Sequence, residues 1–172
     1  MRRTILTLCL IAAMAPAALP SEVFTGAQVA EVIRLRLDRD ELLLESILDT
    51  IKKHKIEDGA VLTAAGTLQV CTFHAVADMA ATPTDKMMTR QGPLEILSLS
   101  GIIAAGEPHL HMTLGNNQGQ TMGGHIEPGC KVLYRAEITI ARFSGPKVAR
   151  LPNKDGVPMM QRVPSSRQPA KK

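Results

Sequence analysis

The stretch VAEVIRLRLDRDELLLESILDTIKKHKIEDG, residues 29–59, changes its hydrophobic period partway along. Over residues 29–37, apolar side chains alternate with arginines, the period of two that marks a half-buried strand. From Leu43 to Ile51, apolar residues recur at spacings of three and four, with acidic residues ahead of them and two lysines behind. The pattern predicts a strand followed by an amphipathic helix of about four turns.

After this helix the sequence is typical of short strands separated by glycine-containing turns. The predicted strands cover residues 60–66, 67–76, 93–105, 108–114, 120–126 and 131–143. Residues 77–92 are predicted to form a long connection, in which Met79, Met87 and Met88 can cover an apolar edge or a partner surface. A strand, a helix and then several antiparallel strands predict an α+β fold: a mostly antiparallel β-sheet with one main amphipathic helix packed on it.

Both ends of the chain differ from this core. Residues 1–18 combine two arginines, a short apolar run and small residues before a cleavage point, which predicts a signal peptide and a secreted, lumenal or periplasmic protein. An organelle transit peptide is the alternative. No segment is apolar over the ~20 residues that a membrane-spanning helix needs. Residues 144–172 predict a basic, disordered tail, which leaves residues 24–143 as one domain.

The net charge of +4 is unevenly distributed. Residues 22–143 hold 11 Lys or Arg against 15 Asp or Glu, whereas residues 144–172 hold seven basic residues against one acidic residue. Phosphate contacts need basic residues on the docking surface, and bases stack on aromatic side chains, of which this chain has one Tyr, three Phe and no Trp. Nucleic-acid binding by the core is therefore disfavoured.

Two cysteines, Cys71 and Cys130, remain after removal of the leader. They can pair in an oxidising compartment, but a single distant pair is not a disulfide framework. The sequence slightly favours two buried free thiols.

Three of the five histidines lie in GEPHLHMTLGNNQGQTMGGH, residues 106–125. On a strand, His109 and His111 point to the same face. The GNNQG segment suits a hairpin turn, and a hairpin centred on Asn117 would place His109 opposite His125 and His111 opposite Gly123, leaving space beside His111. All three imidazoles would then project to one side, because opposed residues share a face.

Three converging neutral imidazoles predict a divalent metal site, with zinc as the metal and one coordination position left open. Two alternatives remain from the residues alone. The histidines can line a polar groove or a subunit contact without binding metal, and a bulge at Gly123 and Gly124 would turn His125 to the other face.

Other polar residues are weaker candidates. Glu107 and Glu127 flank the histidines and are the catalytic candidates, as a general base or as partners that orient an imidazole. Glu95, Ser98 and Ser100 can line a pocket or the polar face of an edge strand. His74 is predicted to be a hydrogen-bonded core histidine, and His54 complements the dipole at the end of the helix. The chain has no G-x-S-x-G, P-loop or dinucleotide fingerprint.

Three segments carry a resemblance to a known family: GPLEILSLSG at 92–101, GEPHLH at 106–111 and GGHIEPGCKV at 123–132. With the helix region, they make residues 31–143 similar to the plants-and-prokaryotes-conserved (PPC) domain. The resemblance implies a compact α+β domain that assembles as a homotrimer, and it matches His109, His111 and His125 to the metal-binding set of microbial single-domain members. Plant members carry DNA-binding AT-hooks, but this chain has no R-G-R-P hook.

The resemblance and the histidine pattern lead to a metal-binding homotrimer, acting as a small-molecule binder or as a hydrolase with metal-activated water. One alternative is a DNA- or polyanion-binding protein that acts through its basic tail. Another is a trimeric scaffold that binds a protein partner through its methionine-rich connection.

Overall fold

The computed structural model describes residues 21–163, so the predicted signal peptide at 1–18 lies outside the described residues. The elements are, in order, β1 (Gln28–Asp38), α1 (Leu43–Lys53), β2 (Asp58–Val76), β3 (Asp85–Ala104), β4 (Glu107–Asn116), β5 (Thr121–Ile126), β6 (Lys131–Ser144), β7 (Val148–Pro152) and β8 (Pro158–Arg162). This confirms the predicted α+β fold with one helix. Within the described residues, no helix is long and apolar enough to cross a membrane.

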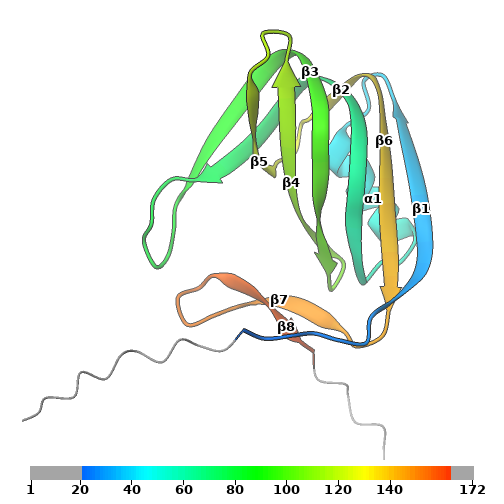
Figure 1. Ribbon diagram of the computed structural model, residues 1–172, viewed down its shortest axis with the longest axis vertical. Coiled ribbons are helices and arrows are strands. Elements are labelled where there is room, and N and C mark those ends of the chain that lie inside the picture. The colour runs from blue at the N-terminus through cyan, green and yellow to red at the C-terminus, as the bar shows by residue number, and fades with distance from the viewer. Residues whose placement is uncertain (1–20, 164–172) are drawn as a thin grey trace, which may run out of the picture.

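The first six strands form one antiparallel sheet in the order β1-β6-β2-β3-β4-β5. The far end of β2 also pairs with β5, through Phe73 opposite Ile126 and His74 opposite His125. Because β2 bonds to both β3 and β5, the strands β2 to β5 close on themselves at that end. Figure 1 shows the sheet curling there, with α1 behind β2 and β6.

The helix is one turn shorter than predicted, because the acidic residues ahead of it form an extended turn. The Asp40 N–H donates to the Val132 carbonyl at 3.0 Å, and the Leu43 N–H donates to the Cys130 carbonyl at 2.8 Å. Residues 40–43 therefore run beside 130–132 before the helix begins. The helix then buries Leu43, Leu44, Ile47 and Ile51 against the sheet.

The core is almost wholly aliphatic. The buried side chains of α1 belong to one hydrophobic cluster with strand residues such as Leu68, Leu99 and Ile140, each of them fully buried. Phe73 is the one aromatic residue in the described core, and Met112 is its one fully enclosed methionine. The side chains that alternate with these core residues point to the opposite face, where the three histidines lie.

The long connection predicted at 77–92 is wrong. Residues 58–76 form one continuous strand, and β3 begins at Asp85, so the loop covers only 77–84. His74 pairs with Met87 in this extended ladder. Gly66 does not break the strand: a Cβ there would lie 2.4 Å from the Arg135 carbonyl oxygen, so glycine permits a close approach of β6.

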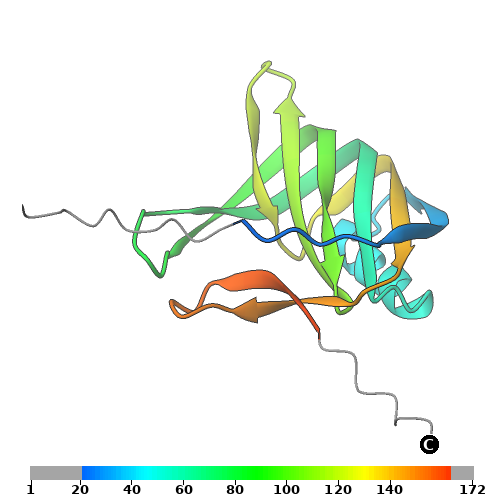
Figure 2. The same cartoon turned by 60° about the horizontal axis from the view of Figure 1, so that its bottom comes forward.

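The prediction of a disordered tail is wrong for residues 148–162. These residues form a hairpin of β7 and β8 that lies below the sheet in both Figure 1 and Figure 2. Val148 and Ala149 are buried, Lys147 forms an ion pair with Glu57, and the Asn153 side chain accepts two backbone N–H bonds in the turn. The basic composition of residues 144–172 suggested a solvated segment, although Val148 and Ala149 are apolar and pack against the rest of the protein.

Cys71 and Cys130 form a disulfide. The preference for free thiols is therefore wrong. The bond joins the middle of β2 to the residue just before β6, and both cysteines are fully buried. It fixes the segment between β5 and β6 to β2, close to the point where β2 and β5 pair through His74 and His125.

Candidate metal centre

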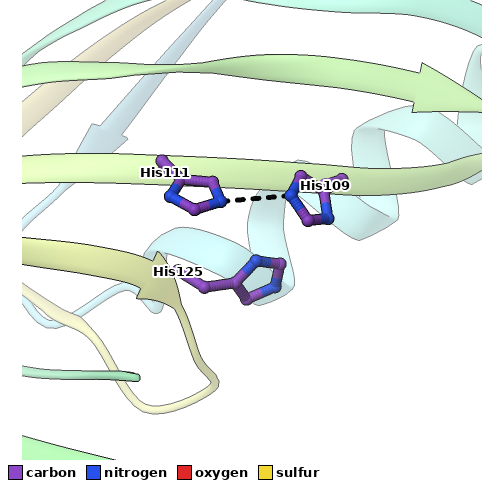
Figure 3. Close-up of side chains that lie close together, drawn as sticks. All are labelled: His109, His111 and His125. Carbon is purple, nitrogen blue, oxygen red and sulfur yellow. Dashed lines mark hydrogen bonds between the residues drawn. The ribbon is translucent and has the colours of Figure 1, made fainter. Parts of the chain in front are cut away.

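The three predicted histidines come together. His109 and His111 project from β4 and His125 from β5, all toward the same side (Figure 3). One ligand nitrogen from each lies within 4.8 Å of the others. The Nε2 atoms of His109 and His111 are 3.1 Å apart, and the ring of His125 lies 4.8 Å from the His109 ring, centroid to centroid.

The strand register differs from the predicted one. His111 lies opposite His125, and Gly123 lies opposite Thr113, because the hairpin is centred on Gln118 instead of Asn117. This moves every cross-strand partner by two positions, which preserves the face to which each side chain points. The grouping of the histidines was therefore predicted correctly although their partners were not. The pairing of β4 with β5 contains no bulge.

The two glycines before His125 let β5 fit between its neighbours. A Cβ on Gly123 would lie 2.0 Å from the Met112 carbonyl oxygen, and one on Gly124 would lie 2.1 Å from the His74 carbonyl oxygen. Gly123 thus permits the close approach of β4. The prediction that it leaves space beside His111 is wrong, because it lies opposite Thr113. The paired glycines allow β5 to bring His125 against both β4 and β2.

The protonation state of His109 and His125 suits metal binding. Burial, with the positive charge of Arg150 and the neighbouring histidines, lowers the pKa of His109 to about 4. Burial, followed by the charges of His74 and His111, also lowers the pKa of His125. Both rings are therefore neutral at neutral pH, and a neutral ring offers a nitrogen lone pair to a metal.

The distances also fit a metal ion. Tetrahedral ligands 2.0–2.1 Å from zinc lie about 3.4 Å apart, and the cluster spans 3.1 Å for one pair of nitrogens and at most 4.8 Å overall. Each ring supplies one ligand nitrogen, and three nitrogen donors with an open fourth position are typical of zinc sites. The three histidines therefore fit a divalent metal.

His74, on β2, packs against this cluster. Its ring stacks on that of His125 at 4.6 Å, and its Nδ1 lies 2.6 Å from Oε1 of Glu127. Its Nε2 lies 3.6 Å from Oδ1 of Asp85. The predicted hydrogen bonding of His74 is confirmed, but its place beside the site was not foreseen, because only the pairing of β2 with β5 brings it there.

The two catalytic candidates lie outside the histidine cluster. Glu127 forms a hydrogen bond with His74, whose ring stacks on that of His125. Glu107 is exposed at the start of β4, opposite Ala104. Ser100 lies directly opposite His111 and so shares its face, whereas Ser98 and Glu95 lie farther along β3, opposite Thr113 and Gly115. His54 follows the last residue of α1, as predicted.

Arg150 is a charged residue that influences the histidine cluster and that sequence reasoning missed. It lies on β7, in the segment predicted to be disordered, and its positive charge acts on both His109 and His125. Its side chain is half-buried, and its Nη2 donates to the Pro158 carbonyl at 3.5 Å. Composition gave no signal for this residue, because its place depends on the packing of the hairpin.

Three comparisons relate this chain to known proteins. It is 32% identical over 123 residues, 72% of its length, to the bifunctional protein GlmU of Synechococcus, of which it spans only 18%. The structure superposes on a PPC protein of Pyrococcus horikoshii with a TM-score of 0.70, at 27% identity, covering 83% of this chain and 99% of that one. A metal-containing protein of Archaeoglobus fulgidus matches with a TM-score of 0.68, at 25% identity, covering 82% and 99% of the two chains.

The profile of the Plants and Prokaryotes Conserved (PCC) domain matches residues 24–144. This range coincides with the six-stranded sheet and its helix, and it stops before the β7–β8 hairpin. The chain therefore belongs to the plants-and-prokaryotes-conserved domain family.

Proposed function

We propose that this protein binds one divalent metal ion, zinc or a similar ion, through His109, His111 and His125. The observation that carries the proposal is the convergence of three imidazole nitrogens within 4.8 Å on one face of the β4–β5 ribbon. The similar protein of A. fulgidus is described as metal-containing, which supports it. Bound zinc would hold and polarise a small ligand or a water molecule in its fourth position.

The surrounding residues act on the ligands and not on the bound molecule. The Nδ1–H of His74 donates a hydrogen bond to Oε1 of Glu127, because an ionised carboxylate can only accept. This bond fixes the ring of His74, which in turn stacks on His125 and limits its rotation. A held ligand set of this kind favours binding, and the geometry supports a ligand-binding role better than a hydrolytic one, since neither glutamate joins the cluster.

The direct test replaces all three histidines with alanine. The variant is expected to lose its metal while it keeps its circular dichroism spectrum, because His111 is exposed and the other two rings are only part-buried. His54→Ala is the matched control, since His54 lies at the end of α1, outside the cluster. Undiminished metal in the triple variant would refute the assignment.

We also propose that the protein is exported and works as a homotrimer. The disulfide between Cys71 and Cys130 supports an oxidising compartment, in line with the predicted leader. The trimer rests on the family resemblance and is supported by large apolar side chains that remain exposed on the sheet, among them Leu62 and Leu97, 51% and 56% exposed.

A further inference from the structure

The β7–β8 hairpin covers an apolar cavity of about 160 Å³, which we name the hairpin cavity. Its walls come from the start of β2, the ends of β3 and β6, the hairpin and the segment before β1, and include Ile102, Ile103, Phe143, Val148, Met160 and Phe24. Two charged residues also line it. The guanidinium of Arg162 lies over the ring of Phe24, 5.7 Å from its centroid, and Asp58 lies at the start of β2, opposite Ala104 in the sheet.

Strand register places this cavity next to the metal centre. Ile102, on the cavity wall, lies directly opposite His109 in the β3–β4 ladder, so the two side chains share a face. Met160, also on the wall, lies directly opposite Arg150 in the β7–β8 ladder. One edge of the cavity is therefore bounded by a neighbour of His109 and by a neighbour of Arg150.

Arg150 has no carboxylate partner among the residues that the structure describes. Its hydrogen bond to the Pro158 carbonyl is long, at 3.5 Å, and its side chain is half-buried. A guanidinium placed next to a site for a metal cation is unfavourable unless an anion lies between them, since two like charges otherwise repel across a partly desolvated space. A negatively charged ligand between them would remove this repulsion.

We propose that the metal centre and the hairpin cavity together bind a small monocarboxylate with an apolar body. This inference rests on the proposed metal function. The carboxylate group occupies the space between the metal and Arg150, whose planar guanidinium suits two parallel hydrogen bonds. The apolar body enters the hairpin cavity, whose size suits a short aliphatic chain or a single ring, since cavities of about 150 Å³ admit benzene.

The two charged residues of the lining, Asp58 and Arg162, have opposite signs, so the cavity presents no net charge to the body of the ligand. Most of the other lining residues are apolar and offer few hydrogen-bond donors to a phosphate.

The test uses the full chain with cobalt(II) in place of zinc, because the visible spectrum of cobalt reports a ligand that enters its coordination sphere. The probes are acetate, propionate, butyrate and valerate, with butyramide as the uncharged control. Each added CH₂ is expected to tighten binding about threefold to fourfold until the cavity is full. Butyramide is expected to leave the spectrum unchanged.

The arginine is tested in parallel. Arg150→Gln is expected to weaken butyrate binding about tenfold or more, whereas Arg150→Lys keeps part of the affinity. Arg135→Gln serves as the matched control, since Arg135 is an exposed arginine on β6. Metal content is measured for every variant, so that a loss of anion binding is separated from a loss of metal.

The outcomes separate the two claims. If the unaltered protein holds no metal, the proposed function fails, and this inference fails with it. If metal is bound at full stoichiometry but affinity does not depend on chain length, or Arg150→Gln binds butyrate as tightly as the unaltered chain, only the carboxylate site is overturned. Tighter binding of inorganic phosphate than of every carboxylate would overturn it as well. The chain-length series uses the unaltered protein, so it tests the carboxylate site even if Arg150→Gln fails to fold.

Discussion

The ring of His125 contacts the rings of three other histidines. Its ring stacks on His74 at 4.6 Å and meets the rings of His109 and His111 edge-on at 4.8 and 5.4 Å. The bond between His74 and Glu127 fixes the stacking partner from behind. The orientation of the His125 ring therefore depends on a carboxylate that does not itself join the cluster.

Replacing Glu127 with Gln is expected to weaken zinc binding by up to about tenfold, the low end of effects seen when groups behind metal ligands change, because Glu127 acts through His74. The neutral amide holds the His74 proton less strongly than a carboxylate does. A chelator competition assay measures the change. Glu137→Gln, on an exposed part of β6, is the control and should keep the original affinity. Equal affinities in both variants would show that Glu127 does not position the site.

Gly124 is predicted to be intolerant of any side chain. Gly124→Ala would bring a Cβ to 2.1 Å from the His74 carbonyl oxygen, so β5 must move away from β2. The expected loss in the free energy of unfolding is about 1–3 kcal/mol or more, measured by urea denaturation. Gly119→Ala, with open space around it but a φ of 76°, should lose only about 1–2 kcal/mol from backbone strain. A Gly124 variant that is fully stable would contradict the close packing of β5.

At the scale of elements, local sequence patterns were predicted correctly, whereas pairings between distant segments were not. The period change at 29–59 and the alternation in β4 are local, and they correctly predicted a strand, a helix and the shared face of His109 and His111. The register of the β4–β5 hairpin depended on the centre of its turn, which several polar residues suited equally well. The β2–β5 pairing and the packing of β7 join segments far apart in sequence, so neither His74 nor Arg150 could be placed from pattern alone.

The disulfide is an element-scale constraint with its own prediction. Cys71 and Cys130 are separated by 59 positions, and opening this loop frees the unfolded chain. The Cys71→Ala and Cys130→Ala double variant is expected to lose about 2–4 kcal/mol in the free energy of unfolding, measured by urea denaturation under oxidising conditions. Thiol titration of the denatured, unreduced protein should find neither cysteine free. Two reactive thiols in that assay would contradict the disulfide.

At the scale of the whole molecule, the β7–β8 hairpin lies below the sheet, beside the end of β3. The family profile matches residues 24–144, and the hairpin that carries Arg150 and part of the hairpin cavity follows this range. In the proposed site, the scaffold supplies the histidines and the hairpin supplies the arginine.

The assembly state belongs to this scale as well. A homotrimer predicts a solution mass about three times that of one mature chain, because exposed apolar residues such as Leu97 and Tyr134 would be covered between copies. Light scattering after size-exclusion chromatography gives this mass directly. A mass equal to that of a single chain across the working concentration range would refute the trimer.

The central claim is that His109, His111 and His125 hold a metal ion. It is tested most directly by elemental analysis of the unaltered protein, purified without chelators from cells grown with zinc. The proposed site predicts about one zinc ion, or one similar divalent ion, per chain. Folded protein that contains no metal after such a preparation would contradict it.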